Sequence, residues 1–189
     1  MDSAIVIAAV LGALLLLVLA WAIATYNRLV RLRTQVDASW AQIDVQLKRR
    51  HSLIPGLVET VKGYAAHERG TLQAVIAARG SAMSASAADP AQQAQAEGLL
   101  TQALGRLFAL AEAYPELRAN QNFLALQSEL AETEDKIAYS RQFYNSAVQT
   151  LNATVQSIPT NLIAGPAGFR QRPFFEAEFD ERQDVQIRF

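Results

Sequence analysis

The sequence has 189 residues, of which 51% are hydrophobic and 19% charged. This balance excludes an intrinsically disordered chain, and the length suits one domain with a short additional element. The absence of cysteine excludes disulfides, thiolate metal sites and a cysteine nucleophile. The net charge of −1 argues against nucleic acid as a partner.

The first element is an apolar segment, residues 4–25, that has no charged residue. A helix from Ala4 to Ala24 would be about 31 Å long, close to the roughly 30 Å of bilayer hydrocarbon. A cleaved signal peptide is the alternative, because Ala-x-Ala sequences occur near the end of this run. The N-terminus of this sequence carries Asp2 and no basic residue, and the apolar run is long for a signal peptide. We therefore expect a retained transmembrane helix that follows a short extracytoplasmic segment, residues 1–3.

Basic side chains follow this segment closely and indicate its orientation. The positive-inside rule places the N-terminus outside and the large C-terminal part in the cytoplasm. Aromatic side chains near the end of the span are typical of the headgroup region. The residues expected at the membrane interface are Trp21, Tyr26, Arg28, Arg31 and Arg33.

The following residues, 26–160, are predicted to form an all-α antiparallel bundle of about four helices. Apolar residues recur at steps of 3 and 4 in each expected helix, as in a coiled coil. No Gly or Pro interrupts residues 26–54, so the membrane helix is expected to continue into the bundle. Asp89 and Pro90 mark a helix start. The last helix is expected to end at Pro159. Residues expected on inward faces include Leu57, Val61, Leu72, Val75, Ile76, Met83, Leu100, Leu104, Leu107, Phe123, Leu130, Tyr144, Leu151 and Ile158.

Opposite charges are expected to meet between the first and last helices of this bundle. In an antiparallel register, the basic run faces an acidic turn, and a second pair lies nearby. With Glu129 and oxygen ligands from elsewhere, the acidic turn could bind a hard cation or act as paired carboxylates, but a layer of salt bridges is the preferred interpretation. The basic run is Lys48, Arg49 and Arg50, the acidic turn is Glu132, Glu134 and Asp135, and the second pair is Asp44 with Arg141.

Pro55 is predicted to bend the first helix. It lacks an N–H group, so the carbonyl of His51, four residues back, loses its helical partner. Asn145 and Asn152 lie one heptad apart in the last helix, and asparagine near a seam can fix register or oligomeric state.

The sequence offers no catalytic, cofactor or metal-binding motif. Neither of the two histidines, His51 and His67, lies in the Glu-x-x-His motif of di-metal bundles. A Gly-x-Ser-x-Gly turn and a phosphate-binding Gly-Lys-Ser/Thr loop are also absent. We therefore expect no enzymatic activity.

The C-terminal segment, residues 161–189, contains Gly, Pro, Phe and an acidic run. Residues 161–169 fall at the membrane end of the predicted bundle. They either touch the bilayer or close the base of the core, and packing against the helices is the preferred interpretation.

Three blocks of this sequence resemble the LemA family of bacterial single-pass membrane proteins. They are YNRLVRLRTQVDASWAQIDVQLKRRHSLIPGLVETVKGYAAHE (26–68), LFALAEAYPELRANQNFLALQSEL (107–130) and TEDKIAYSRQFYNSAVQTLN (133–152), with FFEA (174–177) in the tail. The resemblance implies a membrane helix with its N-terminus outside, a cytoplasmic helical bundle in the bacterial inner membrane, and no established activity or cofactor. It also implies relatives in magnetosomes and gene neighbours that encode a membrane metalloprotease.

These features together favour a non-enzymatic, membrane-anchored scaffold that self-assembles and organises or remodels membranes. Its expected partners are the lipid bilayer and further copies of itself. The alternative is an adaptor or regulator of a membrane metalloprotease or another membrane complex, with the C-terminal tail as the docking element. A hydrolase with an unrecognised site is the third hypothesis.

Overall fold

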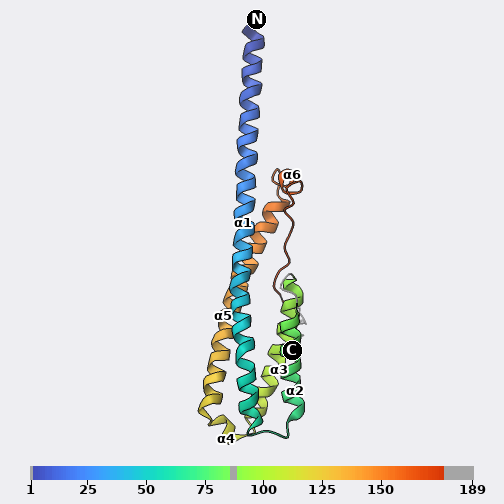
Figure 1. The fold of residues 1–189 in the computed structure, drawn as a ribbon. Coiled ribbons are helices and arrows are strands. Elements are labelled where there is room, and N and C mark those ends of the chain that lie inside the picture. Colours follow the sequence, from blue (N-terminus) through green and yellow to red (C-terminus); the bar gives the residue numbers. More distant parts are fainter. Residues whose placement is uncertain (1, 86–88, 177–189) are drawn as a thin grey trace, which may run out of the picture. The chain divides into compact units, whose positions relative to one another are not determined.

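A computed structural model of the protein describes residues 2–85 and 89–176. Over these residues the secondary structure is helical, without strands, so the predicted all-α class is confirmed. The helices are α1 (Asp2–Lys62), α2 (Arg69–Ser84), α3 (Pro90–Ala111), α4 (Pro115–Arg118), α5 (Gln121–Gln156) and α6 (Asn161–Ala164), as labelled in Figure 1.

Helix α1 contains both the apolar segment and the start of the bundle sequence without a break. Its N-terminal part is long and apolar enough to cross a membrane. The large apolar side chains from Ile5 to Leu19 are each about half exposed or more, so no other part of the described chain covers them. The uninterrupted helix follows from a sequence rich in Ala and Leu, with Pro55 as the one proline inside it.

The chain divides into two compact units. The first, here called the N-terminal unit, comprises residues 1–39 and 144–172, and the second, here called the core unit, comprises residues 40–143 and 173–189. Helices α1 and α5 each contribute to both units.

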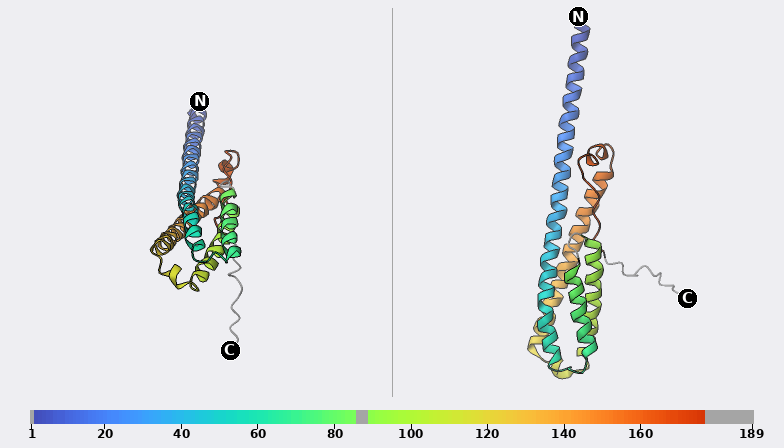
Figure 2. Two further views of the ribbon diagram at one scale, coloured as in Figure 1. Left: turned by 60° about the horizontal axis from the view of Figure 1, so that its bottom comes forward. Right: turned by 45° about the vertical axis from the view of Figure 1, so that its right-hand side comes forward.

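The main apolar core lies in the core unit, where successive long helices run in opposite directions (Figures 1 and 2). Burial of each large aliphatic side chain contributes about 1.5–3 kcal/mol. Helices α1, α2, α3 and α5 all supply such side chains, which include Ile54, Leu57, Val61, Leu72, Val75, Leu100, Leu104, Leu107, Phe123 and Leu130.

Helix α3 begins where the sequence indicated. The carboxylate of Asp89 accepts hydrogen bonds from the backbone N–H groups of Ala91 and Gln92, at 3.1 and 3.2 Å. Pro90 occupies the first turn, where its missing N–H group costs nothing. These two residues set the start of the helix.

Three predicted inward residues are exposed instead. Ile76 and Met83 are 54% and 56% exposed, because α2 presents Leu72, Val75 and the small Ala82 to the core. Ile158 is 84% exposed, since α5 ends at Gln156 and the helical spacing no longer applies beyond it.

Candidate functional site

A cluster of buried charged and polar side chains lies at the centre of the core unit. The side chains of Arg50 and Glu97 are 4% and 6% exposed, and Arg50 Nη1 lies 3.3 Å from Glu97 Oε2. His51 Nε2 lies 2.8 Å from the other carboxylate oxygen of Glu97. Burying charges is costly unless each has several partners, so the other contacts of this cluster matter.

Those contacts connect all four long helices of the core unit. Arg50, on α1, donates to Thr101 Oγ1 on α3 at 2.7 Å and lies 3.2 Å from Glu134 Oε2 on α5. The Gln93 amide, on α3, donates both to Glu97 at 3.0 Å and to the carbonyl of Ala82, on α2, at 3.1 Å. The cluster therefore satisfies its own polar groups while fixing how the four helices meet.

The backbone carbonyl of His51, a member of the cluster, is the group that Pro55 leaves without a helical donor. Pro55 cannot donate to the carbonyl oxygen of His51, and Arg79 Nε on α2 donates to that oxygen at 2.8 Å. Helix α1 thus runs through Pro55 with the lost backbone donor replaced by a side chain from another helix.

The contacts of His51 are those of a structural residue. A catalytic histidine in a triad is oriented by a carboxylate and must also reach a nucleophile. The hydrogen bond of the His51 ring joins it to Glu97, whose other partners are Arg50 and Gln93. Over residues 2–85 and 89–176, no group of three or more His, Asp or Glu side chains could hold a metal ion.

The structure brings together part of the expected charge layer between α1 and α5. Arg50 meets Glu134, and Arg49 Nη2 lies 3.8 Å from Glu132 and 4.0 Å from Glu129. It does not bring Lys48 or Asp44 to α5. These two residues, one helical turn apart, form an ion pair with each other at 2.6 Å.

The remaining residues of the expected charge layer lie on the surface of α5. Asp135 and Arg141 are exposed, and neither forms an ion pair with the part of the chain that the structure describes. Glu132 pairs with Lys136 at 2.6 Å. The hydrogen bond and charge of Lys136, with the charge of Arg49, lower the pKa of Glu132.

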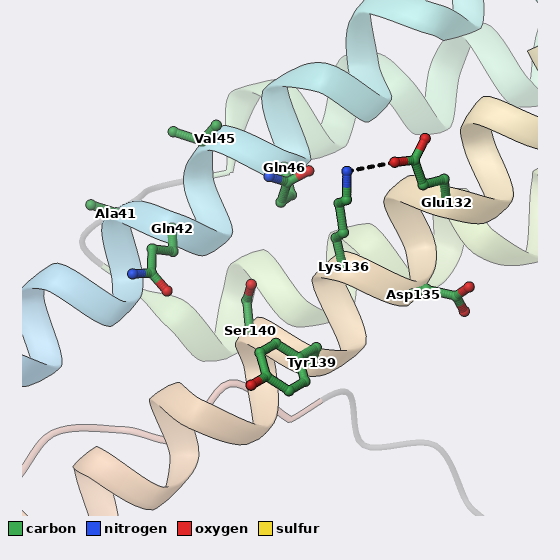
Figure 3. Close-up of a pocket in the computed structure, with 9 residues that line it drawn as sticks. All are labelled: Ala41, Gln42, Val45, Gln46, Glu132, Asp135, Lys136, Tyr139 and Ser140. Atoms are coloured by element: carbon green, nitrogen blue, oxygen red, sulfur yellow. Dashed lines mark hydrogen bonds and ion pairs between the residues drawn. The ribbon is translucent and has the colours of Figure 1, made fainter.

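A groove of about 650 Å³ lies between α1 and α5 in the core unit (Figure 3). Val45 and Tyr139, which line it, are 59% and 64% exposed. Figure 3 shows Gln46 and Lys136 pointing into the space between the helices. The Gln46 Oε1 atom is buried without a hydrogen-bond partner in the described structure. The groove therefore presents exposed apolar surface, and the Gln46 acceptor is shielded from solvent.

In the N-terminal unit, Asn152 holds the segment that follows α6. Its amide donates to the carbonyl of Arg172 at 2.9 Å, and its Oδ1 accepts from the Arg172 N–H at 2.8 Å. The Arg172 guanidinium reaches Asp37 on α1 at 2.9 Å. Asn152 therefore makes its contacts within the chain, and Asn145 is half-buried in the same helix.

Burial raises the pKa of Tyr144, in this same unit, to about 12, with the charge of Arg172 lowering it and that of Asp37 raising it. The phenol therefore stays neutral at physiological pH.

The expected membrane-interface residues lie where α1 first becomes covered. Phe169 is buried, with its ring 5.6 Å from that of Tyr26 and 5.2 Å from the guanidinium carbon of Arg33. Trp21 is 39% exposed, and Arg28 and Arg31 are exposed.

The C-terminal docking element of the adaptor hypothesis falls mostly on residues 177–189, outside the described residues. Just before them, Phe175 is buried against Trp40, with the two ring centres 5.4 Å apart.

Sequence reasoning missed Glu97, the residue at the centre of the buried cluster. A signal was available, because the apolar stripe of Leu100, Leu104 and Leu107 extends back by steps of 3 and 4 to Glu97 and Gln93. A charged residue in line with a buried stripe requires a buried partner.

The fold and these surfaces define a class: a helical-bundle protein whose first helix begins with an apolar segment able to span a membrane. The chain belongs to the LemA family, because the model of that family matches residues 39–189. The family resemblance seen in the sequence is therefore confirmed.

Named relatives come from two groups of bacteria. Magnetosome protein MamQ 2 of Paramagnetospirillum magneticum is 26% identical over 175 residues, covering 80% of this chain and 64% of its own length. Magnetosome protein MamQ of Magnetospirillum gryphiswaldense is 24% identical over 174 residues. Protein LemA of Metamycoplasma hominis is 25% identical over 159 residues, covering 84% of this chain and 72% of its own length. The chain thus spans less than two thirds of the magnetosome relatives.

Proposed function

We propose that this chain is a non-enzymatic, membrane-anchored helical scaffold that self-assembles on the cytoplasmic face of a bacterial inner membrane and organises or remodels that membrane. One observation carries this proposal. The exposed apolar segment and the core residues Ile54, Leu57 and Val61 belong to the same uninterrupted helix, α1. A helix that continues from a membrane segment into the bundle sequence anchors that bundle at the membrane.

The groove between α1 and α5 supports the self-assembly part of the proposal. A helix from a second copy would cover the exposed apolar surface of Val45 and Tyr139. The names of the magnetosome relatives, proteins of a bacterial membrane organelle, support a role in membrane organisation.

Anchoring is tested by alkaline extraction of membranes and by protease protection. We expect the full chain to resist carbonate extraction, and a tag before Asp2 to be cleaved only from outside the cell. Release by carbonate, or cleavage of the tag only from the cytoplasm, would contradict the anchor or its orientation.

Self-assembly is tested by disulfide crosslinking in cell membranes, which is simple here because the chain has no cysteine. We expect Val45→Cys and Tyr139→Cys to give crosslinked dimers under mild oxidation. Ile76→Cys is the matched control, since Ile76 is equally exposed on α2, away from the groove. Monomers at the two groove positions would overturn self-assembly through this surface.

A further inference from the structure

The chain between α5 and Phe169 carries exposed apolar side chains that nothing in the described structure covers. Ile158 is 84% exposed, the highest value among the large apolar residues, and Leu162, on α6, is 70% exposed. Within residues 157–163 only Thr160 and Ile163 are partly covered, and the next residue, Ala164, is buried. We call residues 157–163 the tip.

The tip lies beside the part of α1 where the apolar segment ends. The side chains of α1 from Ile5 to Trp21 are exposed, and burial starts at Ala22 and Thr25. The contact between Tyr26 and Phe169 comes immediately after. Figure 1 shows α6 at the end of α5 and beside α1, consistent with these contacts.

The sequence around the tip has an unusual charge distribution. From Gln142 to Phe169 there is no Asp, Glu, Lys or Arg, and Arg170 follows at once. A segment without charges meets little electrostatic penalty on entering the headgroup region. On α1 the exposed Arg28 and Arg31 follow the apolar segment, and basic side chains there attract anionic headgroups.

We propose that the tip is a second membrane contact, in which Ile158 and Leu162 insert into the interfacial region of the same leaflet that α1 leaves. This inference rests on the proposed membrane anchor. Phe169 meets Tyr26 edge to face and lies under the Arg33 guanidinium, which holds the chain that follows the tip near the end of the apolar segment. With α1 and the tip both held, the N-terminal unit is oriented by two contacts instead of one.

Spin labels on the full-length chain in liposomes containing anionic lipid test the proposal. Nitroxides are placed on Ile158→Cys and Leu162→Cys, with Gln149→Cys as the control, since Gln149 is exposed on α5 of the same unit. Collision with oxygen reports lipid exposure, and collision with a water-soluble nickel chelate reports aqueous exposure. We expect the oxygen-to-nickel ratio at 158 and 162 to exceed that at 149 several-fold.

Two results overturn the proposal: a ratio at 158 and 162 equal to that at 149, or shielding from both reagents, which indicates that protein covers the tip. A label at Leu14→Cys separates this failure from failure of the anchor, because Leu14 lies inside the apolar segment. If the label at 14 is in water, the anchor itself is wrong.

A charge-introducing variant gives a second readout. Leu162→Glu is expected to lower the oxygen-to-nickel ratio of a label at 158 to the value at 149, while Gln149→Glu is expected to leave it unchanged. Leu162 is exposed, so loss of the fold is not the expected effect, and circular dichroism checks this. An unchanged ratio at 158 in Leu162→Glu contradicts insertion of the tip.

Discussion

The two units of this chain bury polar groups by different means. In the core unit, the buried polar centre is ionic: Arg50, His51 and Glu97 lie together among four helices. In the N-terminal unit, the neutral amide of Asn152 binds a backbone N–H and a backbone carbonyl, and the nearby Arg172–Asp37 ion pair is about half exposed.

The two kinds of buried polar contact depend differently on their partners. A buried ion network depends on every partner, because removing one leaves a charge without compensation. An amide that binds backbone needs no compensating charge, which suits a unit whose residues 144–169 are uncharged. Variants of the two units test whether their buried polar groups differ in this way.

The largest effect is expected for Glu97→Ala. It leaves Arg50 without its buried carboxylate and His51 without its ring partner, so we expect destabilisation by about 3–5 kcal/mol. Urea unfolding of the full chain in detergent, followed by circular dichroism, measures it. Glu134→Ala is the matched control, since that partner of Arg50 is 48% exposed and should cost at most about 1 kcal/mol. Equal costs would show that the cluster is not an ionic centre.

Asn152→Ala tests the neutral hydrogen bonds of the N-terminal unit. Loss of two hydrogen bonds to the Arg172 backbone should cost about 2 kcal/mol and release the segment after α6. Faster tryptic cleavage after Arg170 reports the release, since Pro173 protects the bond after Arg172 from trypsin. Thr150→Ala removes only a hydrogen bond within α5 at an exposed site and should leave cleavage unchanged. Cleavage at the wild-type rate in Asn152→Ala would show that Asn152 does not hold the segment after α6.

A double-mutant cycle tests the contact between Arg79 and the carbonyl of His51. Arg79→Ala should cost about 1–2 kcal/mol in the wild-type chain, because Pro55 leaves that carbonyl without a backbone donor. In a Pro55→Ala background the restored N–H should reduce this cost. Additive effects in urea unfolding would show that Pro55 and Arg79 are independent. Pro55→Ala should also change assembly more than folding.

The smallest effect concerns the exposed Glu132 carboxylate. Folding lowers its pKa, so its contribution to stability is present above the unfolded pKa of about 4.3 and is lost as the pH falls through the lower folded value. NMR titration of the side-chain carboxyl should give a pKa below that of an ordinary glutamate. In Lys136→Met the pKa should rise toward the ordinary value, and an unchanged pKa would exclude Lys136 as the main cause.

The amino-acid sequence by itself determined the long helices and the start of α3. The signals that predicted them are local: apolar residues at steps of 3 and 4, the Asp89–Pro90 helix start and the uninterrupted apolar segment. Such signals can be read without knowing which segments pack against each other. The same spacing placed Arg50 opposite Glu134, since two antiparallel helices of known rise have a calculable register.

Only the tertiary structure decided what each polar side chain binds. Lys48 and Asp44 satisfy each other one turn apart, so they do not reach α5. Glu97 becomes the partner of Arg50 and His51 because α3 packs against α1, and the sequence alone does not give that pairing. The end of α5 at Gln156 likewise turns Ile158 outward. Helical periodicity is set by the backbone of one segment, whereas a buried contact depends on two segments and the angle between them.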